Sequence, residues 1–156
     1  MDVKYINPFI NASKILFKDM FGIELTLGKP ELITTETEMH EISATIGLAG
    51  DITGSVIISF PKDSALKAAS LFMRSEILEL SADVYDVIGE MVNIIAGNVN
   101  RDLDKSKVII SLPQVIIGDK YKVKYPENCP TVAIPLNFKE FAFFLVVSFR
   151  EIPNFK

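Results

Sequence analysis

The sequence has little of the side-chain chemistry on which most catalytic sites rely. It contains one cysteine, Cys129, and one histidine, His40. A single cysteine permits no internal disulfide, and it fits a reducing compartment such as the cytoplasm. His40 lies in a polar, loop-like stretch and is expected to be an ordinary surface residue. The composition therefore supports neither a histidine-based triad nor a metal site built from His and Cys.

Other signals are also absent. The net charge is −4 and no basic cluster stands out, which argues against nucleic acid as the main partner. The longest apolar run, 141–147, is far too short to cross a bilayer, and the N-terminus lacks the pattern of a signal peptide. No glycine-rich phosphate-binding motif is present. We therefore expect a cytoplasmic protein that binds neither nucleic acid nor a membrane.

What is present predicts one globular domain over residues 1–156. Hydrophobic residues make up 49% and charged residues 23% of the chain. Periodicity and turn residues predict helices over 7–20, 62–73 and 81–104, and strands over 23–27, 42–48, 55–60, 108–111, 115–117, 121–125, 132–136 and 141–149. The last two strands carry long apolar runs, so we expect them to be covered on both faces or to lie in a subunit interface.

The two halves of the chain resemble each other faintly. Segment 27–33 (LGKPELI) is similar to 110–116 (ISLPQVI), and 52–61 (ITGSVIISFP) to 141–150 (FAFFLVVSFR). The similarity is either chance likeness between amphipathic segments or an internal duplication. A duplication would give an α+β, two-layer fold, in which two long helices pack on one face of an antiparallel-rich sheet and a pseudo-twofold relates the halves.

The predicted helix 81–104 has an unusual polar face. On a helical wheel its polar residues fall in a stripe roughly 80° wide, opposite a broad apolar arc. The stripe consists of Asp86, Glu90, Asn93, Gly97 and Asn100. It lacks the lysines of an ordinary solvated face. Glycine inside a helix costs about 1 kcal/mol relative to alanine, so Gly97 is easier to explain if another molecule approaches closely.

The sequence around this stripe resembles a known family. The segment 89–98 (GEMVNIIAGN), with Asp86 four residues before Glu90, resembles the D/S-x-x-x-E-x-x-N signature of the CheC/CheX/FliY response-regulator phosphatases. Segments 50–60 and 110–113 are also similar to strands of that family. The length and the single signature resemble CheX. In the first helix Asn11 and Lys14 stand where a second Glu and Asn would be, so we expect no second site.

The resemblance implies a function. The partner would be a phosphorylated CheY-like response regulator, and the reaction would be hydrolysis of its aspartyl phosphate. Asn93 would orient the attacking water, and Glu90 would engage a receiver lysine. Asp86, Gly97 and Asn100 would contact the partner, although Asp86 is equally explained as a solvated helix residue. The chain would need no cofactor of its own, with Mg²⁺ bound by the receiver.

The resemblance also implies a homodimer whose sheets join across subunits, and strands 132–136 and 141–149 are compatible with such an edge. Two alternatives remain at this stage. The same surface could bind a receiver without hydrolysing anything, or the fold could serve assembly of the flagellar switch. The intact Glu90/Asn93 pair favours catalysis, and the end of the sequence at Lys156 disfavours a switch component.

Overall fold

The computed structural model describes residues 3–34, 36–103, 106–139 and 141–153. In chain order the elements are α1 (Val3–Phe21), β1 (Thr26–Leu27), β2 (Glu31–Ile33), β3 (Glu36–Glu38), β4 (Ile42–Gly50), β5 (Ile52–Phe60), α2 (Lys62–Met73), α3 (Ala82–Asp102), β6 (Val108–Ile110), β7 (Gln114–Ile117), β8 (Lys122–Lys124), β9 (Thr131–Phe138) and β10 (Phe141–Glu151).

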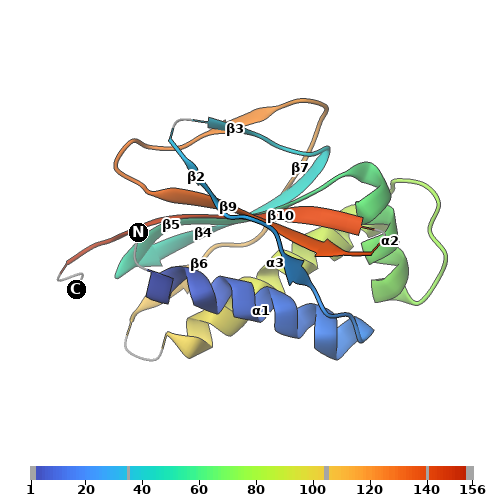
Figure 1. The fold of residues 1–156 in the computed structure, drawn as a ribbon, viewed down its shortest axis with the longest axis horizontal. Coiled ribbons are helices and arrows are strands. Elements are labelled where there is room, and N and C mark those ends of the chain that lie inside the picture. Colours follow the sequence, from blue (N-terminus) through green and yellow to red (C-terminus); the bar gives the residue numbers. More distant parts are fainter. Residues whose placement is uncertain (1–2, 35, 104–105, 140, 154–156) are drawn as a thin grey trace.

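The architecture is the expected α+β fold. An antiparallel sheet has the strand order β1-β9-β10-β5-β4-β6, with β2 also paired to β9 and β7 also paired to β4. The long helices α1 and α3 pack against each other on one face of this sheet (Figure 1). The short ribbon β3–β8 lies over the opposite face. Among the described residues no helix combines the length and apolarity needed to span a membrane.

Each face of the sheet carries its own apolar core. The larger core joins α1, α2 and α3 to the sheet, and its fully buried side chains include Phe17, Ile88 and Leu145. The smaller core lies under the β3–β8 ribbon and includes Tyr125 and Val146. The strands β9 and β10 contribute to both, which explains their long apolar runs and confirms that they are covered on both faces.

The sheet register supports the internal duplication. In the similarity between 52–61 and 141–150, Ser59 corresponds to Ser148. Ser59 pairs with Ser43 on β4, and Ser148 pairs with Thr131 on β9. Both pairs are also buried cross-strand hydrogen bonds, because Ser43 Oγ donates to Ser59 Oγ at 2.8 Å and Thr131 Oγ1 donates to Ser148 Oγ at 2.7 Å. The hairpins β4–β5 and β9–β10 are therefore equivalent in register and in their polar core contacts.

The edge strands follow the same relation. The similarity between 27–33 and 110–116 sets Glu31 against Gln114. Glu31 pairs with Ala133 on β9, and Gln114 pairs with Thr45 on β4. Ala133 and Thr45 are themselves equivalent once Ser43 is matched to Thr131. The similarity of 27–33 to 110–116 and that of 52–61 to 141–150 therefore match the same set of strand pairings, as a pseudo-twofold requires.

The helices complete the relation. With Lys14 matched to Asn93, α1 and α3 share most of their buried positions. Phe9 and its counterpart Ile88 are both buried, and Asn11 and its counterpart Glu90 are both exposed. The match ends near the C-terminus of α1, where Met20 is 43% exposed and its counterpart Val99 is buried. The structure thus relates the two halves element by element, from helix to final strand.

The start of α1 differs from the prediction. Asn7 and Pro8 were expected to begin the helix, but it already starts at Val3 and Pro8 lies inside it. Proline removes one backbone hydrogen bond, a cost that tertiary contacts can offset. Here Tyr5 packs edge-to-face against Phe149, with ring centroids 5.3 Å apart, and this contact holds the extra turn.

Several strand boundaries also differ. The segment 49–54 was expected to be a broad turn, but β4 and β5 are separated by Asp51 alone. The main chain of Lys107 brackets this turn, since Asp51 N donates to Lys107 O at 2.9 Å and Lys107 N donates to Asp51 Oδ2 at 2.6 Å. The strand expected over 23–27 is reduced to Thr26–Leu27.

The position of the apolar strands corrects the expected dimer edge. We expected 132–136 and 141–149 to form a sheet edge, but β10 lies between β9 and β5, and β9 lies between β10 and the β1/β2 pair. Neither strand is free to pair with a second copy. Asp104, the expected end of α3, and Glu140, in the expected 137–140 turn, lie outside the described residues.

Candidate functional site

Helix α3 is held rigidly by its buried side. It packs against α1, α2 and β4, and its buried residues are Val84, Val87, Ile88, Gly89, Met91, Val92, Ile95, Ala96 and Val99. Ser81, the first residue of the predicted helix, is the N-cap of α3 and has an extended backbone, although its side chain makes no cap hydrogen bond. Burial of these apolar residues, each stabilising by about 1.5–3 kcal/mol for a full-sized side chain, fixes α3 without help from its polar face.

The structure brings the five predicted stripe residues together along the outer side of α3. Asp86 and Glu90 are exposed, whereas Asn93, Gly97 and Asn100 are partly buried. Glu90 and Asn93 lie one turn apart, so their side chains project from the same side of the helix. Within the part of the chain that the structure describes, neither side chain makes a hydrogen bond or an ion pair. Their polar atoms are thus free to engage another molecule.

Two glycines of α3 have different roles. A Cβ built on Gly97 would meet no atom within 4 Å, so the fold itself does not require glycine there. A Cβ on Gly89 would lie 3.3 Å from Val115 Cγ2 and 3.9 Å from Pro113 Cβ. Gly89 therefore lets β7 approach the helix, a role that the sequence analysis missed. Its signal was a second helix-interior glycine directly before Glu90.

The segment that meets Gly89 is itself well anchored. Ser111 N donates to Gly47 O at 2.9 Å, and Gly47 N donates to Ser111 Oγ at 2.8 Å. Between Ser111 and Pro113, Leu112 is 86% exposed, an unusual position for a leucine held in an ordered segment. The exposed Leu112 is thus the chain neighbour of Pro113, which lies next to Gly89.

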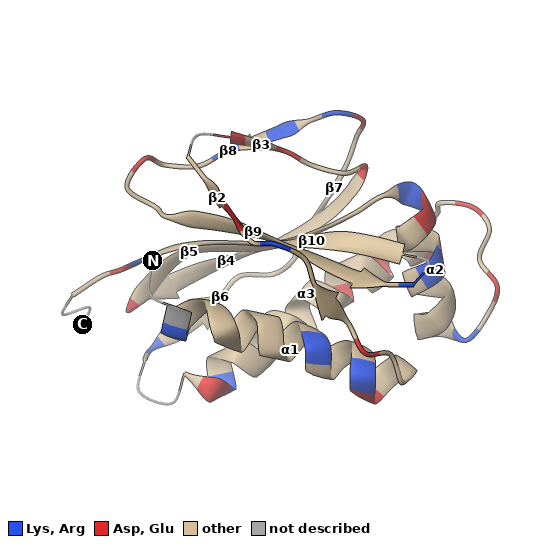
Figure 2. Cartoon of the chain, viewed as in Figure 1, with Lys and Arg blue, Asp and Glu red and all other residues tan. Residues whose placement is uncertain are grey.

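The equivalent face of α1 has a different chemistry. Asn11 and Lys14 replace Glu90 and Asn93, and both are exposed. Lys18 replaces Gly97 and forms a 3.0 Å ion pair with Glu24. Lysines lie along the outer side of α1 in Figure 2, whereas Asp86 and Glu90 make the corresponding side of α3 acidic. The expectation that α1 carries no second site stays a prediction.

His40 and Cys129 lie on the sheet face opposite to α3, apart from the stripe. His40 is partly buried and stacks on Phe144 with ring centroids 4.8 Å apart, which corrects its expected surface position. Burial lowers the pKa of His40, against a smaller opposing effect of Glu41. Cys129 is partly buried, and its Sγ accepts a hydrogen bond from Ser148 Oγ at 3.3 Å. The described residues contain no group of three or more His, Cys, Asp or Glu side chains placed to hold a metal ion.

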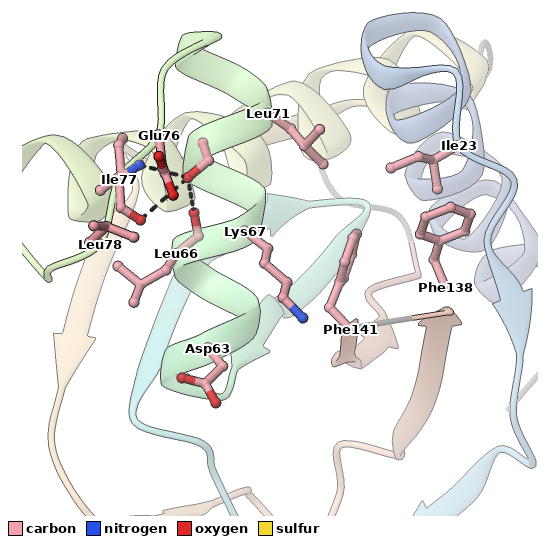
Figure 3. A pocket seen from close by; sticks show the side chains of 11 residues that line it. Ile23, Asp63, Leu66, Lys67, Leu71, Glu76, Ile77, Leu78, Phe138 and Phe141 are labelled. Atoms are coloured by element: carbon pink, nitrogen blue, oxygen red, sulfur yellow. Dashed lines mark hydrogen bonds between the residues drawn. The ribbon is translucent and has the colours of Figure 1, made fainter.

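An apolar groove lies away from the stripe. It has a volume of about 540 Å³ and lies between α2, the connector after it and the tip of the β9–β10 hairpin (Figure 3). Leu66, Ile77 and Phe141 line it, and Lys67 points into it from α2. None of the five stripe residues belongs to its lining, so the groove and the polar face of α3 are separate features.

Comparison with known proteins gives consistent relatives. The family model described as "Chemotaxis phosphatase CheX" matches residues 42–137. The chain is 33% identical over 127 residues to the CheY-P phosphatase CheX of Thermotoga maritima, covering 80% of this chain and 82% of that protein. The segment that the family model matches, 42–137, includes Asp86, Glu90, Asn93 and Pro113.

Solved structures share the fold. A CheC-like superfamily protein from Shewanella superposes with a TM-score of 0.88 at 23% identity, over 96% of this chain and 99% of that one. CheX in the CheX–CheY–BeF3–Mg²⁺ complex from Borrelia burgdorferi superposes with a TM-score of 0.76 at 25% identity, over 94% and 98% of the two chains. The α+β fold predicted from the sequence is therefore confirmed both by the topology and by these likenesses.

Proposed function

This chain belongs to the CheX family of chemotaxis phosphatases, and we propose on that basis that it hydrolyses the aspartyl phosphate of a phosphorylated CheY-like response regulator. The observation that carries the proposal is the pair Glu90 and Asn93, one turn apart on a rigid helix and unpartnered in the described part of the chain. The relative from Thermotoga maritima is a CheY-P phosphatase, which supports the same reaction for this chain.

The chemistry requires a positioned water. An acyl phosphate is hydrolysed when water attacks phosphorus in line with the leaving carboxylate oxygen, so that the P–O bond to the aspartate breaks and inorganic phosphate leaves. A carboxamide suits this task because it is neutral and can both accept a hydrogen bond from the water and donate one. We assign this role to Asn93. Positioning alone can contribute several kcal/mol to lowering such a barrier.

Glu90 would fix how the helix enters the receiver site. Its carboxylate is exposed and has no ion-pair partner among the described residues, so it can form a charge-assisted hydrogen bond with a receiver lysine. Asp86 and Asn100 would contact the partner at either end of the stripe, and Gly97 would let its loops come close. Glu90 would thus contribute to receiver binding, and Asn93 would orient the attacking water.

The metal would come from the partner. The complex from Borrelia burgdorferi contains CheY, BeF3 and Mg²⁺ together with CheX. By analogy, Mg²⁺ bound to the receiver would neutralise phosphoryl charge, and this chain would supply no ligand to it. The chain would act as one domain in the cytoplasm, because both halves share a single sheet and its partner is a signalling receiver.

The decisive experiment separates catalysis from binding. Phosphate release from a panel of phosphorylated CheY-like receivers should be stimulated by the wild-type protein. Asn93→Ala should abolish the stimulation while largely keeping receiver binding, because it removes the amide that orients water but leaves Glu90 in place. Glu90→Ala should weaken both binding and turnover.

The pseudo-twofold supplies matched controls. Asn11→Ala and Lys14→Ala change the equivalent positions of α1, and both should leave turnover unaltered. The free energy of unfolding of all four variants should stay within about 0.5 kcal/mol of wild type, since none of the changed side chains makes a hydrogen bond or an ion pair with the described residues. Full activity of Asn93→Ala would show that the assignment is wrong, and wild-type binding without any turnover would favour a non-catalytic receiver-binding module.

A further inference from the structure

A separate pocket lies on the face of the sheet opposite to α3. Its volume is about 490 Å³, within the range of small-molecule sites. The floor comes from β4, β5 and β10, and the walls come from β8 and the loop that follows it. The lining residues are Thr45, Thr53, Gly54, Ser55, Ile57, Ile116, Val123, Lys124, Tyr125, Pro126, Asn128, Cys129, Ser148 and Arg150.

The charges of this pocket are all of one sign. Lys124 and Arg150 belong to the lining, whereas no Asp or Glu does. The chain as a whole carries a net charge of −4, so an all-cationic lining is contrary to the average surface. Among the described residues neither cation has an ion-pair partner, although Lys122 on the same strand pairs with Glu36 at 3.0 Å. Two unpaired cations at one pocket favour an anionic ligand.

The floor offers neutral hydrogen-bond donors. Thr45 and Ser55 are partly exposed, and in the described part of the chain their hydroxyl groups make no hydrogen bond. Asn128 adds a carboxamide from the loop above. Hydroxyl and amide donors can complete the coordination of phosphate or carboxylate oxygens next to the two cations.

Tyr125 adds no opposing charge. Its side chain forms part of the wall, and its hydroxyl is buried without a hydrogen-bond partner in the described residues. Burial raises the pKa of Tyr125 well above its usual value, so the phenol is neutral at physiological pH. The thiol of Cys129 is turned toward the Ser148 hydroxyl.

The other half of the molecule provides an internal contrast. The pseudo-twofold relates Thr45 to Ala133 and Ser55 to Phe144. The pocket at those positions is smaller, about 280 Å³, and its charged lining residues are Glu31 and Glu38. The same scaffold thus carries a hydroxyl-floored, cationic pocket in one half and a mostly apolar, acidic pocket in the other. The cationic pocket is therefore a property of these particular side chains and not of the fold.

We propose that the pocket between β8 and the β4–β5–β10 floor binds a small anion that carries a phosphate or carboxylate group. Lys124 and Arg150 would hold the charged oxygens, and Thr45, Ser55 and Asn128 would donate to them. This site is distinct from the α3 stripe, because the sheet separates the two, and it does not depend on the phosphatase assignment.

A titration of the full-length protein tests the proposal. Inorganic phosphate and citrate are added separately to ¹⁵N-labelled protein at constant ionic strength, with sodium chloride as the reference salt. We expect saturable amide shifts confined to the lining of this pocket, and none at Ala133 or Phe144 in the equivalent pocket. Saturation by phosphate, by citrate or by both supports the site and identifies the preferred anion chemistry.

Matched variants make the test specific. Arg150→Gln and Lys124→Gln should each weaken binding at least about tenfold, since each removes a charge-assisted hydrogen bond. Lys122→Gln lies on the same strand and should leave binding unchanged. Absence of saturable shifts with both anions, or an equal loss in Lys122→Gln, would overturn the proposal. Either cationic variant suffices if the other fails to fold by circular dichroism.

Discussion

Gly97→Ala should make the protein more stable and the proposed enzyme worse. Gly97 lies inside α3, and a Cβ at this position would meet nothing within 4 Å. The substitution therefore gains helix propensity of up to about 1 kcal/mol without a steric cost. For a domain of this length such a gain raises the melting temperature by about 2–4 °C. The free protein has no structural reason to keep glycine here.

The proposed complex with a receiver would explain why position 97 is glycine. If receiver loops pack against this stretch of α3, an added methyl group at Gly97 enters a close contact. Overpacking of that kind costs about 1–3 kcal/mol, which raises the apparent KM for the phosphorylated receiver about 5- to 150-fold. Once the receiver is bound, Asn93 is unaltered, so kcat should change far less than KM.

The assay joins two measurements on one variant. Urea unfolding and thermal melting report stability, and phosphate release at several receiver concentrations separates KM from kcat. Gly89→Ala is the matched control, because it gains the same helix propensity but places a Cβ 3.3 Å from Val115 Cγ2, so its stability gain should be smaller or absent. A Gly97→Ala protein that is less stable than wild type, or that keeps the wild-type KM, would refute the reasoning.

Two further predictions concern stability and assembly. Because burial lowers the pKa of His40, the unfolded chain takes up this proton first as the pH falls below about 6.5, so stability is retained above that pH and declines below it. His40→Phe keeps an aromatic ring stacked on Phe144 but cannot take up a proton. The free energy of unfolding in urea should therefore change less between pH 7.5 and 5.5, about one unit either side of the free histidine pKa, than in wild type. An unchanged pH dependence would show that other groups cause it. The homodimer predicted from the family remains to be tested, and its sheet contact would use the free edges at β1/β2 or β6/β7. Light scattering at micromolar concentration should give a dimeric mass, and a monomeric mass would contradict it.

The sequence predicted best what depends on local periodicity. Helix α3 and its stripe followed from apolar spacing. The similarity between 27–33 and 110–116 left chance and duplication open, and the strand pairing that decides between them came from the structure. The errors arose where distant contacts decide. Tyr5 holds a turn of α1 before Pro8 through Phe149, and Lys107 tightens the turn at Asp51. No local signal indicates that β10 lies between β9 and β5, because apolar strands suit an edge interface and a sheet interior equally.

In the candidate site, too, some features could be predicted from the sequence and others depend on contacts between distant residues. The choice of Glu90 and Asn93 came from spacing and from a resemblance. That neither side chain is hydrogen-bonded or ion-paired among the described residues is seen only in the folded chain. The cationic pocket was invisible in the sequence, since Thr45, Lys124 and Arg150 come from three distant strands. Gly89 was overlooked because its neighbour Val115 is distant in the sequence, beyond the rest of α3 and β6.

The outer faces of the related helices α1 and α3 differ at more positions than the Glu90/Asn93 pair. At the positions of α1 equivalent to Glu90 and Asn93 stand Asn11 and Lys14, but the difference extends further. Ile10 takes the place of Gly89, and its side chain leaves less room for β2, the counterpart of β7, than a glycine would. Lys18 takes the place of Gly97, and its long side chain, paired with Glu24, occupies the surface that Gly97 leaves open. Of the two related helices, α3 would therefore leave the more open surface to a receiver. Introducing Glu and Asn at positions 11 and 14 of α1 would leave Ile10 and Lys18 in place, which makes the two glycines of α3 as much a part of the proposed site as its carboxylate and its carboxamide.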